Sequence, residues 1–229
     1  MTHSLRPELP SLTPRIRQLP VDRRGYPVPW FVAFVNGEPD HRIADGRKKV
    51  LAIQEKRCWI CGDFLGRYLA FVIGPMCAVN RISADPPMHA DCAEWSVKAC
   101  PFLSRPHARR REGGKSDAVE VAGHMIARNP GVSILWITKD LQLVQDGSGG
   151  ILFGIGAPQT ITCYAEGRTA TADEIRASFM SGLPLLQRVA LDEGPKPLAE
   201  FSAHARIAHR LLGLGELQEL PALSTEAVA

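Results

Sequence analysis

The sequence predicts an α+β fold in which a cysteine-rich module is followed by a small antiparallel sheet and C-terminal helices. Five of the six cysteines lie between Arg57 and Pro101, which gives this segment a chemistry of its own. Short apolar runs separated by turn residues, as is typical of strands, follow in the second half. Helix-initiation signals occur from Thr171 onward. At 229 residues and 45% hydrophobic content, the chain is long enough to bury a core.

The N-terminal segment predicts an extended arm and then a hairpin. Residues 1–29 contain six prolines, a density that opposes regular helix and favours an arm lying on the surface or on a partner. In PWFVAFVNGEPDHRIA, Asn36 and Gly37 suit a two-residue type I′ turn between two strands. Pro39 confines the returning strand to a sheet edge because it lacks a backbone N–H.

The next stretch, DGRKKVLAIQEKR, predicts a short helix with a basic outer face. Its apolar residues Val50, Leu51 and Ile53 are expected to point inward. The residues expected to point outward are Arg47, Lys48, Lys49, Lys56 and Arg57.

Two pairs of residues in the cysteine segment have the spacing of metal ligands. Cys58 and Cys61 form a C-x2-C motif, which is typical of a knuckle wrapped around one ion. His89 and Cys92 are three residues apart at the start of a predicted helix, so both lie on its first turn. The positive end of that helix is expected to favour the thiolate of Cys92. Together these residues predict a tetrahedral Cys3His site for structural zinc.

The 27 residues between Cys61 and His89 leave room for a β-hairpin made from the apolar run YLAFVIG and its return. A knuckle, a hairpin and a helix that supplies the second ligand pair resemble the treble-clef zinc fingers, over about residues 57–100. One alternative is that the cysteines are buried apolar residues beside a stray histidine. An iron–sulfur cluster is a third, but these spacings resemble no ferredoxin-type run and would leave His89 without a role.

Two further cysteines of the segment have no assigned place. Cys100 lies eight residues after Cys92 and either faces the core or replaces His89 as the fourth ligand. Cys77 lies in GPMCAVNR, where it is either an exposed, activated thiol at a turn or a small residue packed under the knuckle.

Several phrases resemble an uncharacterised protein family of bacteria and their phages. The resemblance extends from about Leu19 to Pro195 and implies an intact natural unit in a mobile-element setting, without an activity. The phrases that carry it are LPVDRRGYPVPWFVAFVNGEPDHRIADG, CWICG, FVIGPMCAVNR, PPMHADCAEWSVKACPF, GHMIARNPGV and YAEGRTAT.

The second half predicts strands and then helices. SILWIT and GILFGIG are expected to be strands around the turn-rich QDGSGG, and TITCYAEG a third strand. Thr171 and Glu174 match a capping box that opens a helix, which Gly182 is expected to end before Pro184 starts another. The chain is thus expected to divide into a Pro-rich arm (1–29), a hairpin, helix and zinc module (30–104), a basic linker or loop (105–117), an α/β region (118–200) and a C-terminal helix and tail (201–229).

The net charge of +3 conceals a strongly basic middle segment. Residues 42–115 carry 14 basic and 7 acidic side chains, whereas residues 116–229 carry 8 and 13. This asymmetry favours an anionic partner for the cysteine segment. The sequence shows neither a signal peptide nor a long apolar run, so we expect a cytoplasmic protein without a membrane partner. In that reducing compartment, clustered cysteines favour metal binding over disulfides.

These features favour binding over catalysis, with nucleic acid as the first expected partner. Trp59, Tyr68 and Trp95 are candidates for stacking on bases, although a role in the core explains them equally well. The expected phosphate contacts are Arg47, Lys48, Lys49, Lys56, Arg57, Arg109, Arg110 and Arg111.

Two other functions stay open. The acidic second half also suits a protein-interaction module, such as an inhibitor or adaptor, in which zinc only holds the shape. A nuclease of the HNH class is the third hypothesis, because its active site is built on a treble-clef frame. It lacks support in the sequence, since no Asp-His or His-His pair stands where the catalytic metal would bind.

The basic run should contribute to binding and not to folding. Its charges stand among Pro, Gly and Ser residues, so replacing Arg105, Arg109, Arg110, Arg111 and Lys115 by Ser should leave stability nearly unchanged. If about three of them meet phosphates, the plot of log affinity for DNA against log salt should become about 2 to 3 units less steep. Titrations at several salt concentrations measure this slope, and an unchanged slope would contradict the prediction.

Overall fold

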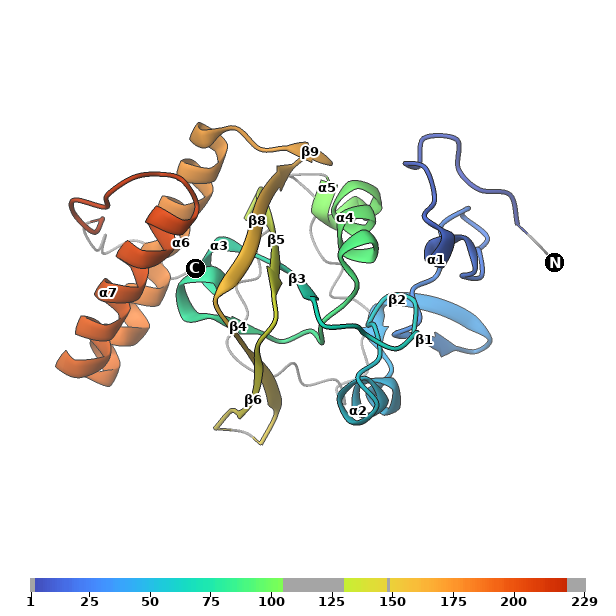
Figure 1. Cartoon of the computed structure of the whole chain (residues 1–229), viewed down its shortest axis with the longest axis horizontal. Helices are drawn as coiled ribbons and strands as arrows, with labels where there is room; N and C mark the ends of the chain where they lie inside the picture. Colours follow the sequence, from blue (N-terminus) through green and yellow to red (C-terminus); the bar gives the residue numbers. More distant parts are fainter. Residues whose placement is uncertain (1–2, 105–129, 148, 222–229) are drawn as a thin grey trace.

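Helices and antiparallel strands are mixed throughout the part of the chain that this computed structural model describes, namely residues 3–104, 130–147 and 149–221. An N-terminal arm and hairpin lie at one end of the molecule, two long C-terminal helices lie at the other, and the main sheet lies between them (Figure 1). The α+β class is therefore confirmed. The described helices include none that combines the length and the apolar character needed to span a bilayer.

The main sheet joins the cysteine segment to the second half of the chain. Strand β3 (Leu69–Ile73) pairs antiparallel with β5 (Ser133–Thr138), which also pairs with β8 (Pro158–Ala165). A short β9 (Arg168–Thr169) completes the order β3-β5-β8-β9. Because β3 and β5 are neighbours, the sheet crosses the expected division between the zinc module and the α/β region.

A second sheet has the order β4-β7-β6. Strands β6 (Leu141–Gln145) and β7 (Ile151–Ile155) form a hairpin, and β4 (Ile82–Ser83) adds to β7. The two strands predicted on either side of QDGSGG, β5 and β7, are both present. The turn after Gln145, however, connects β6 to β7, so β5 and β7 are not joined by it. Strand β6 was not predicted, because LQLVQ is short and largely exposed and so has no buried face to mark it.

The N-terminal segment contains the expected hairpin. Strands β1 (Val32–Val35) and β2 (Glu38–Ala44) pair with each other alone, and both turn residues have the positive φ of a type I′ turn, 52° at Asn36 and 82° at Gly37. Before it, the arm forms a single helical turn, α1 (Pro14–Arg17). Of the two expected positions, on the protein surface or on a partner, the arm takes the first. The fully buried Ile16 anchors it there.

Helix α2 (Gly46–Gln54) forms as expected, but its orientation differs from the prediction. Ile53 packs against the hydrophobic core as predicted, but Val50 and Leu51 are 49% and 38% exposed, and Ala52 is buried. The inward face also carries Lys48 and Lys49, whose ammonium groups donate to the carbonyls of Val32 and Ile151. Lysine stems can lie along apolar surface while their charges reach polar partners, so Lys48 and Lys49 are not on the outer face, whereas Arg47 points outward as predicted.

Two long helices close the fold. Helix α6 (Ala172–Glu193) begins at the expected capping box, and α7 (Pro195–Leu211) follows after one residue, so it starts ahead of the expected boundary at 200/201. The expected break at Gly182 and Pro184 is wrong, because both residues lie inside α6. Close packing requires glycine at position 182, because a Cβ there would lie 2.7 Å from Cγ of Met76.

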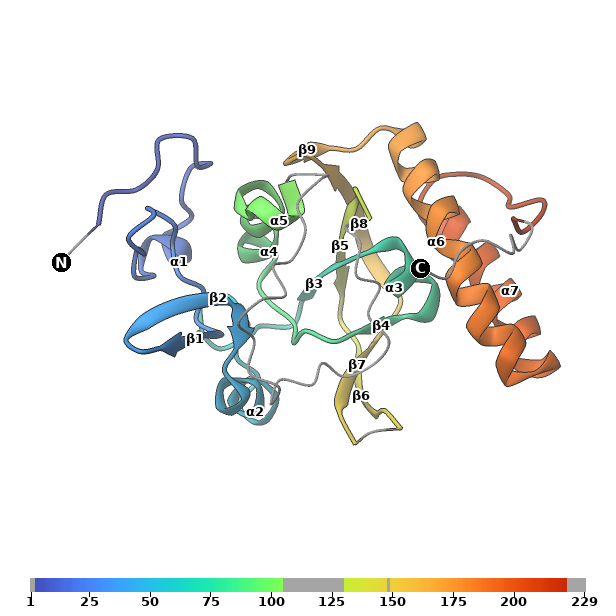
Figure 2. The ribbon, with the colours of Figure 1, turned by 180° about the vertical axis from the view of Figure 1, so that it is seen from behind.

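The main sheet separates two hydrophobic cores. Helix α4 (Ala90–Ala99) packs against β3 and β5 on one side, while α3 (Pro75–Asn80), α6 and α7 lie on the other (Figure 2). Alternate residues of each strand point to opposite sides, so Ile134 and Trp136 enter the larger core and Leu135 enters the core beside α4. The smaller core contains Cys58 and Cys92. The short α5 (Pro101–Ser104) follows α4.

The capping box of α6 should contribute measurably to stability. Thr171 Oγ1 accepts from the Glu174 N–H at 3.3 Å, and Glu174 Oε2 accepts from the Thr171 N–H at 2.7 Å. Thr171→Ala should therefore lower the free energy of unfolding by about 1 kcal/mol, measured by urea titration. The control is Ser202→Ala, which removes a mid-helix hydroxyl that bonds only to the Leu198 carbonyl and should change stability by less. Equal effects would show that the cap is not special.

Candidate metal centre

The first half of the site is a tight knuckle. Arg57 and Phe64 form an isolated antiparallel bridge, and the Cys58 N–H donates to the Asp63 carbonyl at 2.7 Å. The Gly62 N–H donates back to the Cys58 carbonyl at 2.9 Å. Gly62 has φ of 81°, and a Cβ there would lie 2.8 Å from the Trp30 ring, so glycine is required for the turn to close. The C-x2-C spacing thus turns both thiols to the same side.

The second half of the site is the start of helix α4. His89 is the N-cap residue and Cys92 lies in the first turn, as the sequence predicts. The Trp59 N–H donates to the Pro87 carbonyl at 3.1 Å, which ties the knuckle to the residues that lead into this helix. The knuckle and the helix are therefore held together by backbone contacts as well as by the four side chains.

The hairpin expected between the two ligand pairs does not form. Strand β3 uses one edge to pair with β5, and the chain then enters α3 instead of returning. Only an isolated bridge between Ala70 and Met88 stands where a returning strand was expected. The chain turns into α3 at Pro75 directly after β3, so no returning strand forms on the other edge of β3, and this part of the treble-clef resemblance is wrong.

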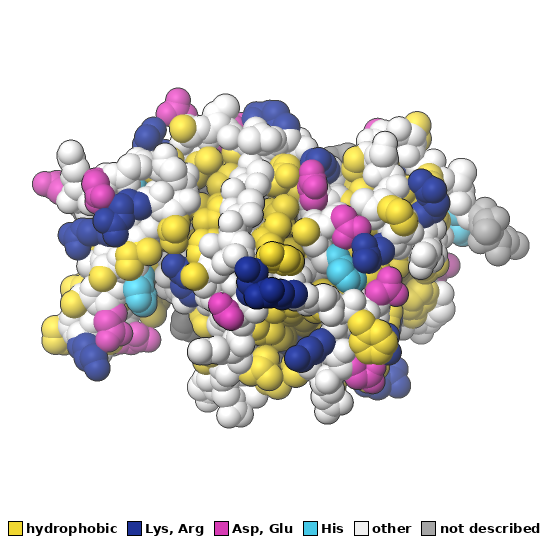
Figure 3. All heavy atoms as spheres, viewed as in Figure 1, with side chains coloured by type: hydrophobic (Ala, Val, Ile, Leu, Met, Phe, Trp, Pro, Cys, Tyr) yellow, Lys and Arg dark blue, Asp and Glu magenta, His cyan; other side chains and the backbone are white. Residues whose placement is uncertain are grey.

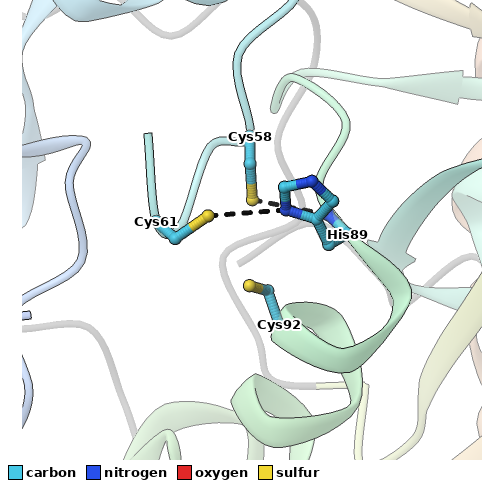
Figure 4. A group of neighbouring side chains, drawn as sticks. All are labelled: Cys58, Cys61, His89 and Cys92. Atoms are coloured by element: carbon cyan, nitrogen blue, oxygen red, sulfur yellow. Dashed lines mark hydrogen bonds between the residues drawn. The ribbon is translucent and has the colours of Figure 1, made fainter. Parts of the chain in front are cut away.

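The four predicted ligands meet at one point. The sulfur atoms of Cys58, Cys61 and Cys92 and a ring nitrogen of His89 all lie within 4.8 Å of one another. Figure 4 shows the two pairs pointing toward each other, one from the knuckle and one from the start of α4. Among the described residues, this is the one group of three or more His, Cys, Asp or Glu side chains arranged to hold a metal ion.

His89 presents the correct nitrogen to the sulfurs. Its Nδ1 lies 3.4 Å from Cys61 Sγ, while its Nε2 lies 3.1 Å from the Phe64 carbonyl oxygen. A carbonyl oxygen only accepts, so the ring proton must be on Nε2 and the lone pair on Nδ1. A metal-binding histidine usually donates its other ring N–H to a carbonyl or carboxylate in this way. The knuckle therefore fixes the histidine in the form that binds a metal.

The three thiols cannot all ionise without a cation. The pKa of Cys58 is lowered because the thiols of Cys61 and Cys92 donate hydrogen bonds to its sulfur. The pKa values of Cys61 and Cys92 are raised because they face that thiolate. The expected favouring of the Cys92 thiolate by the start of the helix stays a prediction, because the pKa shift at Cys92 here is set by the facing Cys58 sulfur. A metal ion would supply the positive charge that lets all three sulfurs bind as thiolates.

The N-terminal arm closes over one side of the site. Arg15 donates to the Asp91 carboxylate of α4 at 3.0 Å and lies 4.0 Å from the Asp63 carboxylate of the knuckle. The Trp95 indole N–H donates to the Pro10 carbonyl at 3.4 Å. A dication with three thiolates and a neutral histidine has a net charge of −1, and the guanidinium of Arg15 stands beside it.

The remaining cysteines lie apart from the site. Cys77 packs against the larger core, on the other side of the sheet from the knuckle, and burial raises the pKa of its thiol. Both expectations for Cys77, an activated thiol and a residue under the knuckle, are therefore wrong. Cys100 is the C-cap residue of α4 and does not belong to the ligand group. Cys163 is buried in the larger core, where its pKa is raised to about 11 by burial.

The basic residues expected to contact nucleic acid have different surroundings. Arg47 is exposed over 94% of its side chain, whereas Lys48 and Lys49 bond to carbonyl groups. Lys56 is exposed, and Arg57 donates to Glu55 and to the Gly62 carbonyl. Arg109, Arg110 and Arg111, with the rest of the basic linker, lie outside the described residues.

The three aromatic residues expected to stack on bases differ in their solvent exposure. Trp59 and Trp95 are 3% and 7% exposed and belong to the smaller core, so they cannot stack on bases, whereas Tyr68 is 53% exposed. The sequence analysis missed Phe64, which is 66% exposed, and Lys139, which lies over the Tyr68 ring. Nothing in the sequence indicates that a single phenylalanine after a knuckle is exposed. Lys139 reaches Tyr68 only through the pairing of β3 with β5.

Comparisons of the chain with models of protein families, with curated proteins and with solved structures found no match. The resemblance to a bacterial and phage family stays a prediction. Function has to be argued from the chemistry of the site and of the surface around it.

Removal of one ligand should release the metal and unfold the smaller core. Cys58→Ser and Cys92→Ser each delete a fully buried donor, and structural metal binding contributes directly to folding. Elemental analysis should find the metal lost, and amide hydrogen exchange should show protection lost around α4. Cys100→Ser and Cys163→Ser, which lie outside the ligand group, should keep the metal. Full metal content in Cys58→Ser would show that the ligand set is wrong.

Proposed function

We propose that this chain is a zinc-stabilised protein that binds nucleic acid. Three thiolates and one imidazole are the donors that zinc favours over harder cations such as Mg²⁺ or Ca²⁺. In a tetrahedral zinc site with bonds of about 2.3 Å, ligand atoms lie roughly 3.8 Å apart. The 3.4 Å between Cys61 Sγ and His89 Nδ1 is close to that spacing.

The proposed zinc is structural. Four protein ligands fill a tetrahedral site and leave no position for water or substrate, which catalytic zinc requires. An HNH-like nuclease would need a histidine that is free to activate water, and both ring nitrogens of His89 are engaged. We therefore do not assign catalysis to this site.

The nucleic-acid part of the proposal is carried by cations that lie beside exposed aromatic rings near the knuckle. In the part of the chain that the structure describes, no carboxylate pairs with Lys56, Arg67 or Lys139. Phe64 and Tyr68 are exposed among them. Figure 3 shows Lys and Arg side chains directly beside apolar ones on one face of the molecule. Positive charge and aromatic rings together are typical of surfaces that bind nucleic acid.

A protein partner is the second candidate, because apolar side chains are exposed on two neighbouring elements. Val50 and Leu51 lie on α2, and Leu143 and Ile151 on the β6–β7 hairpin are 54% and 39% exposed. Lys49 joins the two elements by donating to the Ile151 carbonyl at 3.1 Å. Adjacent exposed apolar residues of this kind also occur at protein interfaces. For either function we propose a bacterial or phage setting, which the sequence resemblance supports.

Two measurements on the purified protein test the proposed function. Elemental analysis should find about one zinc per chain, because one tetrahedral site is present. Affinity for DNA or RNA should fall steeply as salt rises, because cations that contact phosphates displace counterions. Reduced, fully folded protein without metal would contradict the zinc assignment. Absence of salt-dependent binding to any nucleic acid would contradict the nucleic-acid assignment and favour the protein partner.

A further inference from the structure

We infer that Phe64 and Tyr68 form a stacking surface for the bases of single-stranded nucleic acid, with Lys56, Arg67 and Lys139 as its phosphate contacts. This inference rests on the proposed nucleic-acid binding and adds the form of the ligand and the residues that read it. The loop from Phe64 to Tyr68, which joins the knuckle to β3, is called the stacking loop below.

Phe64 is the most exposed large hydrophobic residue in the described part of the chain, at 66%. Its backbone is nevertheless held firmly, because it bridges to Arg57 and its carbonyl lies 3.1 Å from His89 Nε2. The Arg57 guanidinium lies 4.4 Å from the centre of the ring and is itself fixed by the Gly62 carbonyl. The metal centre thus holds an apolar ring in solvent, an arrangement that loses little conformational entropy when a base stacks on it.

Tyr68 is held in a similar way at the other end of the stacking loop. It precedes β3, and Lys139 follows β5; the pairing of Leu69 with Thr138 makes them neighbours across the two strands. The Lys139 ammonium lies 5.2 Å from the centre of the Tyr68 ring. Each ring of the loop therefore has one cation over it, and Tyr68 is 53% exposed.

The length of the loop fits a few nucleotides. Phe64 and Tyr68 are four positions apart in the chain, so their Cα atoms lie at most about 14 Å apart. At about 3.4 Å per nucleotide, that is the length of roughly four stacked bases. The exposed Arg67 lies between the rings, and Lys56 is tied to the loop because its carbonyl accepts from the Leu65 N–H at 2.8 Å. The stacking loop therefore carries two exposed rings with a cation over each, and Arg67 stands between them in the sequence.

A single strand fits this surface better than a duplex. In a duplex the faces of the bases are covered by their neighbours, so an exposed ring has nothing to stack on. In a single strand each base offers a face, and stacking on an aromatic side chain is largely independent of base identity. We therefore expect little sequence preference, and the same chemistry serves for single-stranded DNA and RNA. The adjacent Glu55 neutralises Arg57, so the proposed phosphate contacts are Lys56, Arg67 and Lys139, which pair with no carboxylate among the described residues.

The test combines removal of a ring with removal of the bases. Full-length, metal-loaded protein is titrated with labelled oligothymidylate of about 12 nucleotides, with its uridylate counterpart, with the same strand in duplex form and with a strand of equal charge made of abasic sites. Phe64→Ala and Tyr68→Ala are compared with the conservative variants Phe64→Trp and Tyr68→Phe. Phe34→Ala is the matched control, because Phe34 is 55% exposed with Lys48 5.9 Å from its ring centre but lies on the β1–β2 hairpin. Zinc content is measured for every variant.

Each alanine variant of the stacking loop should bind the thymidylate strand about fivefold to a hundredfold more weakly, with zinc content unchanged. The conservative variants and Phe34→Ala should stay near wild type. On the abasic strand and on the duplex, Phe64→Ala should have no effect, because no base face is available. Parallel results with DNA and RNA would identify shared stacking chemistry, and a difference would show which of the two the surface prefers.

Other results would overturn the inference. If wild type binds thymidylate, abasic strand and duplex equally, and the alanine variants match it, phosphate contacts alone carry the binding. The proposed function then stands and the stacking surface does not. An equal loss in Phe34→Ala would also overturn it, because the effect would not belong to this loop. If wild type binds no nucleic acid at any salt concentration, both the inference and the nucleic-acid assignment fail.

Discussion

The convergence of three thiols and one imidazole holds together the part of the molecule from the N-terminal arm to α4. Cys58 and Cys61 belong to the knuckle, and His89 and Cys92 belong to the start of α4, so closing the site ties two segments about 30 residues apart. Apparent binding free energies of structural zinc are about 10 kcal/mol or more, which is as large as the whole net stability of a typical domain. A polar cluster in a small hydrophobic core is otherwise costly, because neighbouring thiolates repel each other. A bound ion of the kind that this donor set favours would offset the repulsion between the thiolates, and its bonds would become the main stabilising contact.

The sheet carries this constraint to the rest of the fold. Strand β3 leaves the knuckle, pairs with β5 and meets Met88 just before α4, so the cluster of three thiols and one imidazole also positions an edge of the main sheet. Alternate side chains of β5 then serve two cores, with Leu135 beside the site and Trp136 in the larger core. The two cores are thus separated by one strand layer and share its register. A shift of one residue in that pairing would exchange their side chains.

The surface near the knuckle differs from the core in a way that fits the proposed binding of nucleic acid. Trp59 and Trp95 are buried and stabilise the centre, while Phe64 and Tyr68 face solvent on a loop anchored by the same centre. Exposed rings on a rigid support, each with a cation over it, are a preorganised surface for flat, anionic ligands. The cluster of Cys58, Cys61, His89 and Cys92 and the proposed stacking loop are therefore parts of one structure, in which the first holds the geometry of the second.

Local chemistry determined what could be predicted from the sequence. The ligands Cys58, Cys61, His89 and Cys92 follow from spacings of a few residues, because a knuckle and a helix turn each orient two side chains without help from the rest of the chain. The Asn36-Gly37 hairpin and the capping box at Thr171 were predictable for the same reason.

Tertiary structure alone decided which partner β3 takes, which face of α2 is buried and whether α6 continues past Gly182. These outcomes depend on segments that are distant in the sequence. β5 pairs with β3 from more than 60 residues away, the carbonyls of Val32 and Ile151 accept from Lys48 and Lys49, and Met76 fills the space that a Cβ at Gly182 would take. The pairing of Tyr68 with Lys139 has the same origin, since residues 71 positions apart in the chain become neighbours only through strand register.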